Sequence, residues 1–147
     1  MNSIKIQQLL KKRCGQTFLG VFPIDRLPQR LPPRRPLLLV CNTDPHDKPG
    51  NHWIALYIAH NGEFFDSFGE PPQKTFELYL EKHCNSFTVN NKVLQSILSA
   101  FCGHYAIFYC LMKMLNYDLN EIIACFGTDT ALNDYIVHQF VCVGLAH

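Results

Sequence analysis

Hydrophobic and polar positions at the start of the chain follow a helical period. Apolar residues recur on one side of residues 3–13, which predicts an amphipathic helix. Asn2 or Ser3 can cap this helix, and Gly15 can end it. Residues 23–36 then bring five prolines and four arginines. Because proline removes the donors that strand pairing needs, we expect a loop over this stretch.

The pattern changes next to one that is typical of strands. Residues 37–43 form an almost continuous apolar run, which predicts a buried strand. Residues 53–59 and 63–68 are rich in aliphatic and aromatic side chains. The Asn-Gly signal within residues 60–62 predicts that these two strands form an antiparallel hairpin. Residues 87–94 are expected to form a fourth strand.

Helical patterns return in the second half of the chain. Residues 73–83 suit an amphipathic helix, whereas residues 101–117 are apolar on nearly every side and predict a buried central helix. Two further helices are expected over residues 119–126 and 129–141. This order of elements predicts an α+β fold with a small, mainly antiparallel sheet. The length fits a single domain that spans residues 1–147.

Composition narrows the class of protein. Hydrophobic residues make up 48% of the chain and charged residues 17%, so the chain can bury a core and is not of the disordered class. The net charge of +1 gives no strong attraction to nucleic acid. Basic residues gather early in the chain and form either a solvated surface or a patch for phosphate or an acidic partner. They are Lys11, Lys12, Arg13, Arg26, Arg30, Arg34 and Arg35.

The pattern also bears on the compartment. Residues 1–15 are charged and amphipathic, unlike a secretory signal. No apolar run reaches the roughly 18 residues of a membrane span. We therefore expect a protein of the cytosol, the nucleus or a particle assembled there, without a membrane partner.

Seven cysteines are many for such a chain, and they are irregularly spaced. No C-x-x-C pair is present, so we expect no metal site of the zinc-finger kind. A disulfide scaffold is not expected without a secretory signal. Most of these cysteines are interpreted as small buried apolar residues. They are Cys14, Cys41, Cys84, Cys102, Cys110, Cys125 and Cys142.

Cys102 stands out because it lies where the buried helix should begin. A thiol at a helix N-terminus faces free N–H groups and the positive end of the helix dipole, which favour the nucleophilic thiolate. The alternative is one more core cysteine.

Three polar residues could complete a catalytic group with this cysteine. His52 stands directly before a predicted strand, and Asp66 lies in the strand that pairs with it, so Asp66 could orient the imidazole. Gln95 precedes Cys102 by seven residues, at the predicted end of a strand, and its amide could donate to an oxyanion. The alternatives are a surface histidine, an aspartate that caps a turn and an exposed glutamine.

The order and local sequence of these residues resemble the adenovirus endoprotease (adenain) family of cysteine proteases. The resemblance covers most of the chain, and its motifs together are highly specific. The matching motifs are Phe18-Leu19-Gly20, Cys41-Asn42-Thr43, Gly50-Asn51-His52-Trp53-Ile54-Ala55, Phe65-Asp66-Ser67-Phe68-Gly69, Gln95 and Ser99-Ala100-Phe101-Cys102-Gly103.

The resemblance implies a papain-like or Ulp-like fold with the nucleophile at the start of the central helix. It implies that His52 is the general base, Asp66 the orienting acid, Gln95 the oxyanion donor and Cys102 the nucleophile, with Trp53 shaping the cleft. The implied reaction is acyl transfer through a thioester, as in other thiol proteases. The implied substrates are capsid and core precursors, cut at glycine-containing sites during particle maturation.

The resemblance also implies activators. Cys84 lies at the place where the family has a cysteine that forms a disulfide with a short activating peptide. The family is stimulated by DNA, but the near-neutral charge of this chain gives that interaction little electrostatic support. No small-molecule cofactor is expected, and the protein should be a monomer in the virion and in the host nucleus or cytoplasm.

Two other functions remain open. The same fold and triad occur in proteases that remove SUMO or ubiquitin-like modifiers, although those enzymes usually hold the glutamine one residue closer to the cysteine. A catalytically inactive protease fold that serves as a binding module is the second alternative. A minor DNA virus or a Polinton-like element would be a fitting source for the protease.

Overall fold

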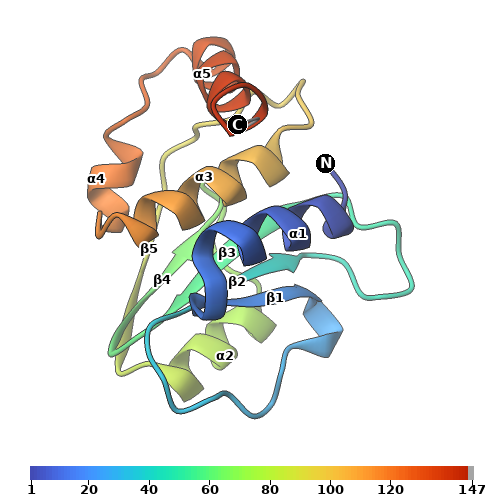
Figure 1. Ribbon diagram of the computed structural model, residues 1–147, viewed down its shortest axis with the longest axis vertical. Coiled ribbons are helices and arrows are strands. Elements are labelled where there is room, and N and C mark those ends of the chain that lie inside the picture. Colours follow the sequence, from blue (N-terminus) through green and yellow to red (C-terminus); the bar gives the residue numbers. More distant parts are fainter. Residues whose placement is uncertain (146–147) are drawn as a thin grey trace.

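A five-stranded sheet lies at the centre of the computed structural model, which describes residues 1–145 (Figure 1). The strands stand in the order β1-β2-β3-β4-β5. Their bounds are β1 Phe18–Pro23, β2 Leu37–Asn42, β3 Trp53–Ile58, β4 Asn61–Phe65 and β5 Ser86–Val89. The three central strands pair antiparallel, as expected, whereas β1 and β5 run parallel to their neighbours. Long connections therefore reach both edges of the sheet.

Helices cover both faces of the sheet (Figure 1). Helices α1 and α3 pack on one face, with α4 and α5 beyond α3, whereas α2 covers the opposite face. Their bounds are α1 Ser3–Cys14, α2 Lys74–His83, α3 Cys102–Met114, α4 Leu119–Ile123 and α5 Thr130–Cys142. Short 3-10 turns occupy Gly15–Thr17 and Ile24–Arg26. The α+β fold class is confirmed.

Strand β2 shows why its sequence is apolar throughout. Successive side chains of a strand point to opposite faces. Leu38 and Val40 join the core under α1 and α3, whereas Leu37, Leu39 and Cys41 join the core under α2. Every residue of this strand is buried, because helices or loops cover both sides.

Most predicted elements are present, with shifted bounds. The β3–β4 hairpin is confirmed, but its tight turn falls before Asn61, which already pairs with Ser86 of β5. The predicted strand over residues 87–94 ends at Val89. The sequence reasoning missed β1, a short strand that contains Gly20 and ends at a proline.

The helix ends follow simple capping chemistry. Asn2 caps α1 by accepting from the backbone N–H of Lys5, and Gly15 adopts a positive φ of 57° directly after the helix. Helix α3 ends earlier than predicted, at Met114, and Asn116 follows with a φ of 68°. None of the helices within residues 1–145 combines the length and apolar character that crossing a membrane requires.

Candidate active site

Cys102 is the first residue of α3, as the sequence predicted. The residue before the helix, Phe101, offers no side-chain cap, so the first backbone N–H groups of α3 have no such partner. Gly103 follows in a crowded place, where a Cβ atom would lie 3.2 Å from the Trp53 ring and 3.1 Å from Met1. A glycine after the cysteine therefore lets the start of α3 approach the start of β3.

His52 is the residue directly before β3. It faces Asp66, which directly follows the neighbouring strand β4. Its Nε2 lies 2.7 Å from Oδ1 of Asp66, and its ring stacks on Phe68 with centroids 5.0 Å apart. The other ring nitrogen, Nδ1, is buried and makes no hydrogen bond within the described chain. The Asp66 contact fixes the imidazole so that Nδ1 can accept a proton from Cys102.

Asp66 is held by several hydrogen bonds directly after β4. Its carboxylate also accepts from the backbone N–H of Phe68 at 2.9 Å. Asn90, which is buried, accepts from the backbone N–H of Asp66 at 2.9 Å and donates to its carbonyl at 2.6 Å. Sequence reasoning missed Asn90, which fell inside the predicted strand of residues 87–94, although two consecutive asparagines are unusual in a strand and could have indicated its end.

The pKa values of the thiol and the imidazole move in opposite directions. Burial opposes the charged form of His52, but Asp66 and Cys102 outweigh it and raise the pKa of His52 to about 9. Burial would raise the pKa of Cys102. The imidazole of His52 and the backbone N–H groups of Trp53 and Gly103 outweigh burial and lower that pKa. Both shifts favour a thiolate beside an imidazolium.

Gln95 is buried close to the acid but does not contact the thiol or the imidazole by a hydrogen bond in the described chain. Its Oε1 accepts from the Ser67 hydroxyl at 2.6 Å. Its Nε2 donates to the carbonyl and to the hydroxyl of Ser99, each at 3.2 Å. Gln95 also lies in a loop, not at the end of a strand, so that part of the prediction is wrong. A donor role toward substrate requires Nε2 to turn from Ser99.

The segment of residues 90–95 binds Gln95 to the loop after β4 that carries Asp66 and Ser67, here called the acid loop. The backbone N–H groups of Leu94 and Gln95 both donate to the carbonyl of Ser67, at 2.9 and 3.1 Å. Gly69 makes the approach of the two segments possible, because its φ is 69° and a Cβ there would lie 2.8 Å from the Lys92 carbonyl oxygen.

Cys84 follows α2 and packs in the core on the other face of the sheet from α3. A Cβ on Gly62 would lie 2.5 Å from its sulfur. Burial raises the pKa of the Cys84 thiol, which disfavours the thiolate that disulfide exchange needs. The packing therefore gives no support to the expected disulfide with an activating peptide.

No protein-family model matches the chain. It is similar to cysteine proteases from two isolates of African swine fever virus, at 24% identity over 115 residues in each case. One of them is named a SUMO-1 cysteine protease. The match covers 69% of this chain, and the chain spans 42% of the length of these curated relatives.

Two solved structures are also similar to this chain. The crystal structure of the pS273R protease of African swine fever virus matches 93% of this chain and 66% of its own, with a TM-score of 0.68 and 16% identity. This chain has the fold of a papain-like cysteine protease. The central domain of the uncharacterized Lpg1148 protein of Legionella pneumophila matches 99% of this chain and 96% of its own, at 13% identity and a TM-score of 0.56. The adenoviral resemblance stays a prediction.

Proposed function

We propose that this chain is a cysteine endopeptidase. The observation that carries the proposal is a thiol at the N-terminus of α3 beside an imidazole that a buried aspartate holds at 2.7 Å. Three further features support it: the opposed pKa shifts, the protease fold and the similarity to viral cysteine proteases. Each residue has the chemical property that its role demands.

The reaction begins with attack of the Cys102 thiolate on the scissile carbonyl, which forms a tetrahedral oxyanion. His52, as the imidazolium, donates its Nδ1 proton to the leaving amine, and a thioester remains. His52 then takes a proton from water, which attacks the thioester and releases the acid product and the Cys102 thiolate, so the thiolate–imidazolium pair is restored. Asp66 holds the ring in position through Nε2 during both steps.

The oxyanion requires donors that are already in place. The backbone N–H of Cys102 at the start of α3 supplies one, and we assign the second to Gln95 Nε2 after release from Ser99. The Ser67 hydroxyl would continue to donate to Gln95 Oε1. The side-chain amide would therefore rotate with Oε1 fixed while Nε2 moves. The serine thus limits the positions that Nε2 can reach.

For substrates, we propose precursor proteins of a viral or virus-like particle that are cut at glycine-containing sites. The similarity to viral proteases supports the class of source. Trp53 packs against Gly103 beside the thiol, and the carbonyl of Asn51 lies 3.9 Å from the Cys102 sulfur. These close neighbours favour small side chains next to the scissile bond.

The test is cleavage of a pooled library of Gly-Gly and Gly-X-Gly peptides under reducing conditions by the wild-type chain and by Cys102→Ala. Cutting after glycine by the wild-type protein alone would support the proposal. Cutting by both proteins at equal rates would refute it. If neither cuts, capsid-derived peptides and DNA are added, and inactivity in their presence favours the inactive binding module.

A second candidate function is removal of a ubiquitin-like modifier. The observation that favours it is the name SUMO-1 cysteine protease given to one of the similar viral proteins. Covalent capture of Cys102 by SUMO or ubiquitin carrying a C-terminal electrophile would support this candidate. Capture only by short glycine peptides with the same electrophile would favour the endopeptidase.

A further inference from the structure

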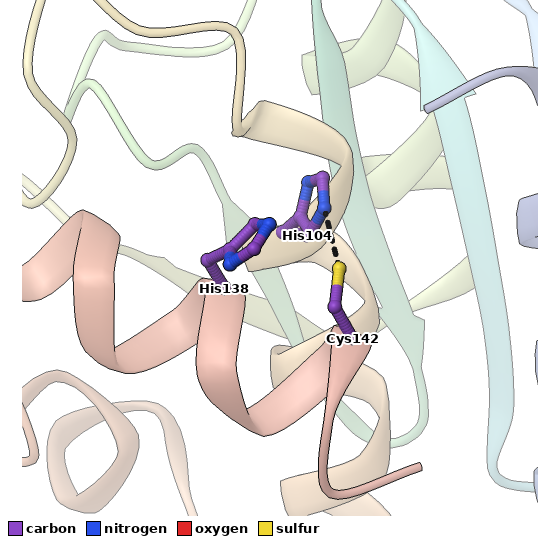
Figure 2. A group of neighbouring side chains, drawn as sticks. All are labelled: His104, His138 and Cys142. Atoms are coloured by element: carbon purple, nitrogen blue, oxygen red, sulfur yellow. Dashed lines mark hydrogen bonds between the residues drawn. The ribbon is translucent and has the colours of Figure 1, made fainter. Parts of the chain in front are cut away.

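A second group of reactive side chains lies between α3 and α5, outside the proposed triad. Figure 2 shows His104 from the first turn of α3 and His138 and Cys142 from α5 pointing toward one another. One donor atom from each of the three lies within 4.8 Å of the others. These residues show no metal-ligand spacing along the chain, because His104 lies more than thirty residues before His138 and Cys142.

The geometry of this group fits a tetrahedral metal ion. With Zn–S near 2.3 Å and Zn–N near 2.0–2.1 Å, a sulfur and a nitrogen on one zinc lie about 3.5 Å apart. The Sγ of Cys142 and the Nε2 of His104 are 3.5 Å apart. His138 is half-buried, and its donor nitrogen lies within 4.8 Å of the other two donor atoms.

The surroundings support a binding site rather than a chance cluster. His138 and Cys142 are four residues apart on α5, so both occupy the same face of that helix. His104 is buried, its Nδ1 has no hydrogen-bond partner in the described chain, and its Nε2 makes the 3.5 Å contact to Cys142. Phe101 packs on both rings, with centroids 5.0 and 5.2 Å away, and so fixes their positions.

An ion can also reach the group from solvent. A hollow of about 560 Å³ is lined by His104, Cys142 and residues of α1. Lys5 and Lys12 line the same hollow. They repel the ion to some extent, and the charge of the thiolate offsets this repulsion.

We propose that His104, His138 and Cys142 bind a zinc ion, which fastens the end of α5 to the first turn of α3. Two imidazoles and a thiolate suit a borderline-soft ion and not magnesium or calcium. The ion replaces the thiol proton of Cys142, which leaves to solvent, and water completes the coordination. Because the first turn of α3 also carries Cys102, the ion would stabilise the position of the proposed nucleophile.

The test uses the 147-residue chain with Cys102→Ala, which removes the other thiol–imidazole pair as a metal ligand. The protein is reduced, freed of metal with a chelator and titrated with cobalt(II), whose thiolate charge-transfer band reports sulfur ligation. We expect one equivalent to bind, zinc to displace it, and zinc to raise the melting temperature. Since the assay measures binding and not turnover, it is independent of the proposed protease activity.

Three variants of that protein locate the ion. Cys142→Ser and His138→Ala should each weaken binding by at least 10–100-fold, roughly the loss that changes around a metal ligand already cause. Cys125→Ser is the matched control, because Cys125 is also an exposed free cysteine of the C-terminal half. It should bind like its parent. Melting curves in chelator verify that each variant is folded.

The proposal is overturned if no thiolate band appears. It is equally overturned if the band survives both ligand variants, or if Cys125→Ser removes it. A band that depends on Cys142 and His138 together, and not on Cys125, supports the site.

Discussion

Replacement of Asp66 by Asn tests whether the charge of this residue tunes His52. An asparagine can keep its oxygen where Oδ1 accepts from His52 Nε2, at 2.7 Å, and from the N–H of Phe68, at 2.9 Å. The variant therefore keeps the geometry and loses the negative charge. The two side chains are 19% and 6% exposed, so solvent screens the lost interaction only in part.

The size of the expected change in the pKa of His52 follows from hydrogen-bond energies. A hydrogen bond to a charged group contributes about 1.5–3 kcal/mol and a neutral one about 0.5–1.5 kcal/mol, so the charge is worth about 1–1.5 kcal/mol. This difference equals about one pKa unit. The pKa of His52 is raised to about 9 in the wild-type protein, and in the variant it should fall by about one unit.

The assay is the pH dependence of kcat/KM on a glycine peptide. Activity needs the protonated imidazole, so the alkaline limb follows the pKa of His52 and should move down by about one unit in Asp66→Asn. Asp25→Asn is the matched control, because Asp25 pairs with His46 on the surface. Its profile should equal that of the wild type. An alkaline limb that stays in place or moves upward in Asp66→Asn would refute the reasoning.

Three further predictions concern other residues. Gln95→Glu keeps an oxygen for Ser67 but loses the amide donor, so kcat should fall on the order of 10²-fold while the melting temperature changes little. An unchanged kcat would exclude an oxyanion role for Gln95. Gly69→Ala should lower the free energy of unfolding by about 1–3 kcal/mol in urea titrations because of its positive φ and its contact with the 90–95 segment; a neutral effect would contradict this account. Glu63→Ala should cost about 3–5 kcal/mol in the same titrations, because it leaves the buried ammonium of Lys113 without its partner at 3.1 Å, whereas Glu63→Gln should cost less; equal losses would argue against the charge.

The sequence predicted the helix and strand order well where the pattern was local. Residues 37–43 were apolar enough to predict β2, and the chemistry of Asn2 and Gly15 predicted both ends of α1. Strand β1 was missed because its partner is β2, which is reached through a long proline-rich loop, and because Gly20 and the terminal Pro23 are residue types that strands rarely contain.

The candidate site, like the fold, could be predicted only where the signal was local. His52, Asp66 and Cys102 could be predicted, because element ends and motif order place them together. The partners of Gln95 could not be predicted, because they depend on how an irregular loop folds back on residues 66–67. His104, His138 and Cys142 were not expected as a group, since the packing of α5 on α3 is a tertiary contact without a local pattern.

The attachment of the 90–95 segment to the acid loop has a consequence for how this protein can change. Hydrogen bonds join Asn90 to Asp66 and join Leu94 and Gln95 to Ser67, so the base-orienting acid and the proposed oxyanion donor share one support. Substitutions in the two segments should therefore not add, and a double-mutant cycle should give a coupling energy of about 0.5–3 kcal/mol. A variant that is tolerated in one segment would then depend on which residues occupy the other, and the two stretches would evolve as a unit.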